Sequence, residues 1–214
     1  MSLMQYLEIF TLITGIIYVI LEILQKNSMW ILGFFTALAA AIVFFSEKLY
    51  ASSGLNAYYV IMSVIGYYTW YKDSQKLKSR QREESLQTQQ GHTDWSEIKK
   101  SDAKIHLNKI SNKVLVYSAI ALVAGTIALY YILRYLGDPM GLLDAYVTIL
   151  SALATVWLVK SYIAQWLLWV IADILSATLC LAQGMPWMGT LYFLYALSAI
   201  YGYIYWKRHG VNVD

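Results

Sequence analysis

The fold is decided by two matching stretches of sequence, 59-YVIMSVIGYYTW-70 and 195-YALSAIYGYIYW-206. They are offset by 136 residues, and the same offset relates Trp30 to Trp166 without a gap. In a chain that is 59% hydrophobic, such a repeat indicates that a membrane unit was duplicated. Many transporters are built from repeated membrane units, because a substrate site between two halves can open to one side and then to the other. The repeat therefore predicts a transporter.

The composition excludes an ordinary soluble domain. Only 14% of the 214 residues are charged, whereas soluble domains have about 25%. Apolar runs of roughly 17 to 25 residues are needed to cross a bilayer core about 30 Å thick, and the sequence contains seven. The predicted spans are residues 5–24, 29–46, 50–71, 114–135, 142–160, 163–182 and 187–206. The first span has no basic segment or cleavage site before it, so we expect it to be retained rather than removed as a signal peptide.

The distribution of basic residues predicts the orientation. The segment 72–113 holds ten of the sixteen Lys and Arg residues, and placing it in the cytoplasm leaves only Lys48 and Arg134 outside. The N-terminus is then outside and the C-terminus inside, which agrees with an odd number of spans. The net charge of +3 reflects this topology, and no nucleic-acid partner is indicated.

This orientation makes the two copies parallel, with the fourth span as an inverting linker. The predicted fold class is an all-α integral membrane protein with seven helices in a 3+1+3 arrangement. Its parts are residues 1–72 (first three-helix bundle), 73–113 (cytoplasmic loop), 114–136 (linker helix) and 137–214 (second bundle and short cytoplasmic tail). The polar composition of residues 72–90 predicts a disordered tether, and Trp95–Ile110 reads as a solvated loop or a short helix on the membrane surface. Pro139 and Pro186 are expected in outer loops.

An acidic residue in the middle of a span is the strongest candidate for binding a substrate. Asp173 shares a helical stripe with Trp166, Trp169 and Ser176. A carboxylate with indole rings beside it suits a flat cationic ring, which the indoles attract and the acid orients. The alternative is a structural Asp bonded to a neighbouring helix, with both tryptophans at the membrane interface.

Other polar residues in the spans are weaker candidates. Asp144 and Thr148 begin a stripe that continues through Ser151 to Thr155. Helix packing is the expected role of Thr155, whereas Asp144 and Thr148, nearer the outer mouth, are candidates for contact with the substrate. Asn56 and Tyr59 lie on one side of the third span, and Tyr195 is the repeat equivalent of Tyr59. Glu22 is expected to reach water or to pair with Lys26, four residues later.

The sequence contains no signature of an enzyme or of a cofactor site. There is no phosphate-binding glycine loop, Cys180 is the only cysteine, and His92, His106 and His209 have no metal-ligand spacing. No cofactor or metal is expected. The endings Gly66-x-x-x-Trp70 and Gly202-x-x-x-Trp206 predict close helix packing, followed by tryptophans that anchor the spans at the inner interface.

Several motifs, in this order and with seven spans, resemble the PnuC family of bacterial vitamin transporters. The motifs are Trp166-x-x-Trp169-x-x-x-Asp173, Leu49-Tyr50-Ala51, Gly66-Tyr67-Tyr68-x-Trp70 and Gly202-Tyr203-x-x-Trp206. The resemblance implies a fold related to the SWEET sugar transporters, with the substrate between the bundles, in a bacterial inner membrane. It also implies facilitated diffusion, in which a cytoplasmic kinase phosphorylates the vitamin and prevents its return. The oligomeric state stays open, and a homo-oligomer is compatible with the resemblance.

The resemblance leaves the substrate open. The nicotinamide riboside type carries Asn where this chain has Asp173, and the whole pattern is nearest to the thiamine branch, PnuT. Thiamine is therefore the first expectation, with nicotinamide riboside second, since both are cations that a carboxylate can bind. A membrane scaffold without transport activity and a proton-coupled transporter are the competing classes.

Overall fold

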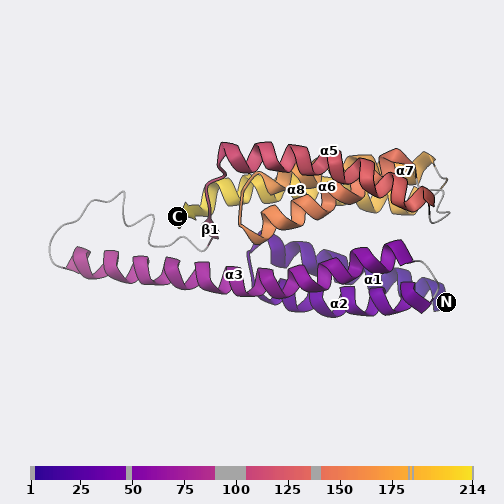
Figure 1. Ribbon diagram of the computed structural model, residues 1–214. Helices are drawn as coiled ribbons and strands as arrows, with labels where there is room; N and C mark the ends of the chain where they lie inside the picture. The colour runs from indigo at the N-terminus through magenta and orange to yellow at the C-terminus, as the bar shows by residue number, and fades with distance from the viewer. Residues whose placement is uncertain are drawn as a thin grey trace.

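The computed structural model describes residues 3–46, 50–89, 105–135, 141–182, 184 and 186–213. These residues form seven long helices and two short strands (Figure 1). The helices are α1 (Leu3–Ile23), α2 (Ser28–Ser46), α3 (Tyr50–Gln89), α5 (Asn112–Tyr135), α6 (Leu142–Val159), α7 (Gln165–Ala182) and α8 (Pro186–His209), and the strands are β1 (Ile105–Leu107) and β2 (Gly210–Asn212). Apart from the end of α3, each helix agrees with its predicted span to within three residues at either end.

The apolar character of the helices fits a membrane protein. Among the described residues, α5, α6 and α7 are each long and apolar enough to cross a membrane. Shorter apolar segments, Ile13–Ile23 and Ser28–Ile42, lie in α1 and α2. Pro186 is the first residue of α8 and not part of a loop as expected; proline is tolerated there because its missing N–H would have no partner in the first turn. Pro139 lies outside the described residues.

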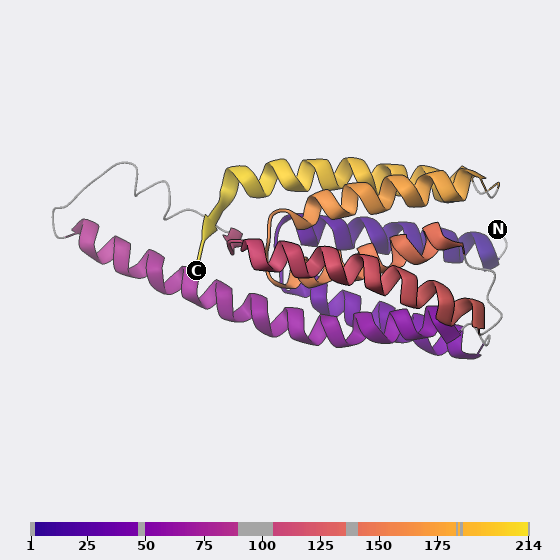
Figure 2. The same ribbon diagram turned by 45° about the horizontal axis from the view of Figure 1, so that its top comes forward.

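Helix α3 is almost twice as long as its predicted span, so the disordered tether expected over residues 72–90 is wrong. The helix continues to Gln89 and projects beyond the other helices (Figures 1 and 2). Residues 72–89 contain no Gly or Pro and are rich in Lys, Arg, Gln and Glu, which favour helix when nothing interrupts it. Asp73 and Leu77 are buried on one side of this projection. The rest of the expected cytoplasmic loop, residues 90–104, lies outside the described residues.

The helices form two layers (Figure 1). One layer contains α1, α2 and α3, and the other contains α5 to α8. Within the layers α2 packs along α3, α7 packs along α8, and α5 lies against α6. The layers meet where α1 contacts α8 and where α3 contacts α6. In terms of the sequence repeat these two contacts are equivalent, since each joins the first helix of one copy to the third helix of the other.

The repeat is preserved in individual hydrogen bonds. The turns after α1 and after α6 contain five backbone hydrogen bonds that recur at the 136-residue offset. In each turn a residue with left-handed backbone follows the helix, Gln25 (φ 50) or Ser161 (φ 52). The N–H groups of Lys26 and Tyr162 donate to carbonyls five residues earlier, at 2.9 and 3.0 Å. Each helix thus ends in a Schellman motif, which satisfies the last carbonyls of the helix.

The two glycine–tryptophan endings pack as predicted at the glycine but not at the tryptophan. Trp30 and Trp166 lie directly on Gly66 and Gly202, so the close packing is confirmed. Trp70 and Trp206, however, are completely buried. Their indole N–H groups donate to the carbonyls of Leu158 (3.0 Å) and Ile23 (2.9 Å), at the end of the first helix of the opposite copy. Interface anchoring by these two tryptophans was therefore a wrong prediction.

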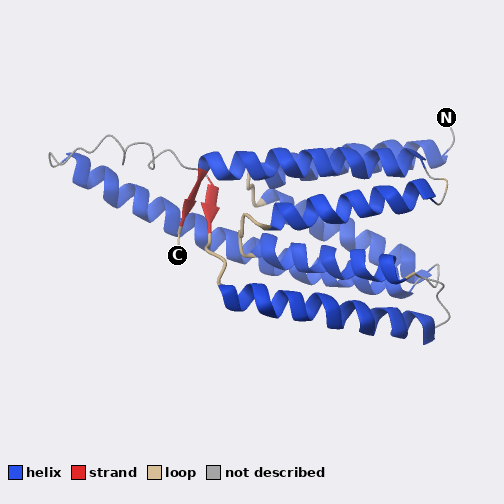
Figure 3. Ribbon diagram, turned by 90° about the horizontal axis from the view of Figure 1, so that it is seen from above, coloured by secondary structure: helices blue, strands red, loops and turns tan. Residues whose placement is uncertain are grey.

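A two-stranded parallel sheet closes one end of the molecule (Figure 3). It pairs β1 with β2, so that His106 lies opposite Val211, and the N–H of Val213 extends it by donating to the carbonyl of Leu107 at 2.9 Å. The part of Trp95–Ile110 that the structure describes thus begins with a strand and not with a helix. The pairing brings the C-terminal tail onto the segment that precedes α5.

Candidate functional site

The candidate site lies between the two layers, where α1 and α3 face α7 and α8. Asp173 is buried on α7 and Glu22 is buried on α1, with 8% and 5% of their surfaces exposed. The two carboxylates are close enough for their charges to interact, and Asp173 acts in the same way on the hydroxyls of Tyr192 and Tyr195. Two acids buried together in an apolar bundle favour a positively charged ligand, because an isolated charge there is costly.

Tyrosines from both layers surround the acids. Tyr18 lies near Glu22 and Tyr59, and Tyr59 lies near Tyr192 across the interface between the layers. The hydroxyl of Tyr195 contacts α1 at Gly15, where a larger residue would collide with it. Tyr59 and Tyr195, both predicted as site residues, are therefore brought to this interface. Their phenol groups give the site walls that are apolar and can also form hydrogen bonds.

The two predicted tryptophans differ in their surroundings. Trp166 is buried against Gly202 and makes an edge-to-face contact with Trp206, with 5.4 Å between ring centroids. Trp30 makes the corresponding contacts in the first copy, so the position of Trp166 is explained by packing. Trp169 is only partly buried and has Gly33 as its repeat equivalent. Trp169 is thus the better candidate for stacking on a ligand, and its indole N–H makes no hydrogen bond to the described residues.

The remaining predicted residues lie on α3, α6 and α7. Asp144 lies near Cys180. Asn56, Thr148 and Ser176 are each half-buried on their helices. A contribution of these four residues to substrate binding stays a prediction. Thr155 donates to the carbonyl of Ser151 in its own helix at 2.9 Å, which suits the expected packing role.

Glu22 neither reaches water nor pairs with Lys26, so that prediction was wrong. The helix ends at Ile23 and the chain turns at Gln25 through its left-handed conformation, which removes Lys26 from the helical face. Instead the amide of Gln165, at the start of α7, lies beside the carboxylate of Glu22. Neither Glu22 nor Gln165 was predicted as a site residue, although both are buried beside the acidic site. The signal was present in the repeat, because their equivalents in the other copy, Leu158 and Met29, are apolar.

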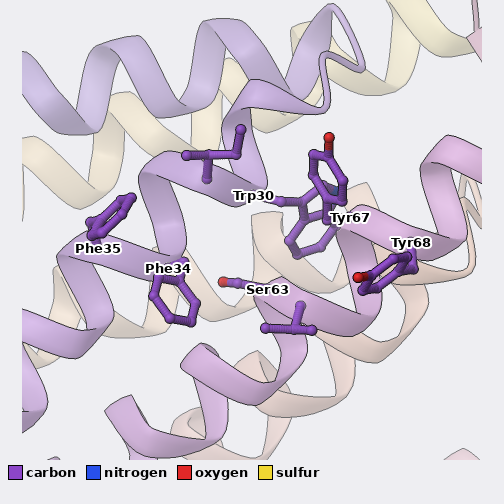
Figure 4. Close-up of a pocket in the computed structure, with 8 residues that line it drawn as sticks. Trp30, Phe34, Phe35, Ser63, Tyr67 and Tyr68 are labelled. Atoms are coloured by element: carbon purple, nitrogen blue, oxygen red, sulfur yellow. The ribbon is translucent and has the colours of Figure 1, made fainter.

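A separate groove of about 220 Å³ lies on the face of α2 and α3 (Figure 4). Trp30, Ser63 and Tyr67 line its inner side. Phe35 and Tyr68 at its edge are 63% and 68% exposed. Because its walls are aromatic and open to the side of the bundle, the groove faces the position expected for lipid and is distinct from the acidic site.

A network of hydrogen bonds closes the end of the molecule that carries the strands. The amide of Gln25 donates to Ser161 Oγ at 3.2 Å, joining equivalent positions of the two copies. It also donates to the carbonyl of His106 (2.9 Å) and accepts from the His106 N–H (2.8 Å). The His106 ring packs edge-on against Trp70, and burial lowers the pKa of its imidazole to about 4, although the Asp73 carboxylate opposes this shift. At this end the two copies are locked together.

Further contacts tie the projecting part of α3 and the tail into this network, which we call the end closure. Asn108 donates to the Asp73 carboxylate at 3.0 Å and to the carbonyl of Lys160 at 2.9 Å. Arg80 donates to the carbonyl of Asn212 at 3.2 Å. No group of three or more His, Cys, Asp or Glu residues suited to a metal occurs among the described residues.

Comparison with known proteins agrees with this architecture. Residues 5–208 match the family model described as nicotinamide mononucleotide transporter. The nicotinamide riboside transporter PnuC of Escherichia coli (strain K12) is 23% identical over 214 residues, covering 95% of this chain and 85% of that protein. The protein of the same name from Neisseria mucosa is 26% identical over 212 residues, covering 92% and 72%. A crystal structure of the vitamin B3 transporter PnuC superposes with a TM-score of 0.64 at 25% identity, covering 93% of this chain and 81% of the other.

Proposed function

The chain belongs to the PnuC family of membrane transporters, and from this premise we propose that it carries nicotinamide riboside into the cell. The likeness to nicotinamide riboside transporters supports this most. The buried Asp173 carboxylate, with tyrosines and Trp169 around it, offers such a cation a place to bind between the two layers. The pyridinium ring of nicotinamide riboside is flat and positively charged. An indole face attracts such a ring, and the carboxylate compensates its charge.

Thiamine, the first expectation from the sequence, is not supported. The relatives named above are nicotinamide riboside transporters, and the solved relative is described as a vitamin B3 transporter. The thiamine expectation depended on Asp173 standing where the nicotinamide riboside type has Asn. A carboxylate binds either cation, so this difference alone does not favour thiamine.

The proposed mechanism uses the repeat. The two copies, α1–α3 and α6–α8, act as parallel three-helix bundles joined by the inverting helix α5, in the 3+1+3 arrangement of SWEET transporters. The recurring turns and the exchanged indole bonds of Trp70 and Trp206 support this symmetry. The end closure keeps the site shut on its side, and release of substrate there requires the Gln25–Ser161 contact to separate.

The end with the strands is proposed to face the cytoplasm of a bacterium whose inner membrane the protein crosses several times. The basic residues of the described chain support this, because Lys26, Lys160 and Lys207 flank the end closure while Arg134 ends α5. No energy source is needed if a cytoplasmic kinase phosphorylates the vitamin, since the charged product cannot return.

Uptake into liposomes tests this function. Purified protein is reconstituted with a nicotinamide riboside kinase and ATP inside, and labelled nicotinamide riboside is added outside. Accumulation of phosphorylated product that persists with an uncoupler is expected. Absence of flux for nicotinamide riboside and thiamine alike would favour a scaffold, and collapse with the uncoupler would indicate proton coupling.

A further inference from the structure

Glu22 and Gln165 form a buried polar pair that the proposed binding of the charged ring does not use. Glu22 is on α1 and Gln165 is the first residue of α7, so the pair joins the two copies. Gln165 has no exposed surface and Glu22 has 5%. One carboxylate oxygen of Glu22 and both polar atoms of the Gln165 amide lack a hydrogen bond of good geometry with the described residues, although the amide lies close enough to the carboxylate to stabilise its charge.

Packing does not explain these residues. At the equivalent positions of the other copy the chain has Leu158 and Met29, which are also completely buried. The same backbone environment therefore accepts apolar side chains. A buried polar group without a partner costs about 1 to 3 kcal/mol, so polar residues at these positions need a function that the apolar equivalents do not have.

The set of unsatisfied atoms indicates the chemistry of the missing partner. The Gln165 nitrogen needs an acceptor, whereas its oxygen and the Glu22 carboxylate need donors. A metal ion or a proton would serve the oxygens and would give the amide N–H groups no acceptor beyond the neighbouring carboxylate. A hydroxyl group both donates and accepts, and two neighbouring hydroxyls would satisfy all three atoms.

We propose that Glu22 and Gln165 bind the hydroxyl groups of the substrate. This role rests on the proposed transport of nicotinamide riboside and extends the binding site beyond Asp173 and Trp169. The charge of Asp173 acts on Glu22, which places the two buried acids near each other. Asp173 and Trp169 hold the charged ring, and Glu22 with Gln165 holds the sugar on the side toward the end closure. Glu22, Gln165 and Asp173 all stand where the opposite copy has apolar residues. The polar positions then bind the substrate, while their apolar equivalents serve only to pack the helices.

The test compares two ligands on purified full-length protein. Nicotinamide riboside and its 2′,3′-dideoxy analogue carry the same charged ring and differ in two hydroxyls. Their dissociation constants are measured by calorimetry for the native protein, for Glu22→Gln, for Gln165→Met and for the control Glu83→Gln, which changes an exposed acid on the projection of α3.

In the native protein and in Glu83→Gln the analogue should bind roughly tenfold or more weakly than the riboside, because hydrogen bonds to a charged group are involved. In Glu22→Gln and in Gln165→Met the difference should fall to about threefold or less, with the affinity for the analogue unchanged. Unchanged affinity for the analogue also shows that the variant is folded.

Two results would overturn the proposal. The native protein could bind both ligands equally, which needs no variant to establish. Alternatively, Glu22→Gln and Gln165→Met could keep the native difference, in which case the pair does not bind the substrate hydroxyls. If the native protein binds neither ligand saturably, the proposed function itself fails, and this outcome is distinct from both.

Discussion

Replacing Gly202 with Ala tests the close packing of the Trp166 ring on α8. A Cβ atom at this position would lie 2.6 Å from two carbon atoms of the Trp166 ring. That ring has 2% of its surface exposed and meets Trp206 on another side, so it cannot move away freely. Gly54 on α3 offers a matched control, because its Cβ would meet nothing within 4 Å.

The expected magnitudes follow from these distances. Overpacking of a buried contact costs about 1 to 3 kcal/mol, and Gly→Ala in a helix returns up to about 1 kcal/mol. Gly202→Ala should therefore lose up to roughly 2 kcal/mol, whereas Gly54→Ala should gain up to about 1 kcal/mol. For a chain of this length 1 kcal/mol corresponds to about 2 to 4 °C in Tm.

The assay is thermal unfolding in detergent, followed by tryptophan fluorescence, together with binding of nicotinamide riboside. Gly202→Ala should unfold several degrees below the native protein and bind more weakly, since Trp169 follows Trp166 on the same helix. A Tm equal to that of Gly54→Ala would refute the close packing of Trp166 on Gly202.

Three further predictions concern the acid, the end closure and pH. Asp173→Asn should weaken binding of nicotinamide riboside more than tenfold, measured by calorimetry, because a charge-assisted contact is worth about 1.5 to 3 kcal/mol; equal affinity would remove Asp173 from the site. Gln25→Ala loses three buried hydrogen bonds and should cost roughly 3 kcal/mol in denaturant unfolding, whereas the exposed control Gln75→Ala should cost almost nothing; equal losses would contradict the network. Because burial lowers the pKa of His106 from 6.5 to about 4, the folded state favours the neutral ring, and its contribution is complete above pH 6.5 and is lost as pH falls toward 4. This loss of roughly 3 kcal/mol should disappear in His106→Gln and persist in His209→Gln, and a native protein equally stable at pH 4.5 and pH 7 would contradict it.

The sequence predicted most of the helices because each span is a continuous apolar run. It failed at α3, where the strongly polar residues after Trp70 were interpreted as a tether. Composition distinguishes a membrane span from a polar segment, but it does not distinguish a solvated helix from a coil. Here helix propensity continues the span, and burial of Asp73 and Leu77 beside β1 supports it.

The candidate site was predicted in part. Asp173 was identified because an acid in a span is costly, and Tyr59 and Tyr195 followed from the repeat. Glu22 was misinterpreted because a Lys four residues later suggests a helical ion pair, and the left-handed turn at Gln25 is not evident from the residue type. The contact between Gln25 and Ser161 joins two distant turns, which no local pattern reveals.

The measurement that tests the central claim most directly is equilibrium binding of nicotinamide riboside and thiamine to the purified protein, followed by quenching of its tryptophans. The account predicts saturable quenching by nicotinamide riboside, because Trp169 and Asp173 form a site for its charged ring, and a more than tenfold weaker affinity in Asp173→Asn. Saturable quenching by thiamine without any response to nicotinamide riboside would contradict the account.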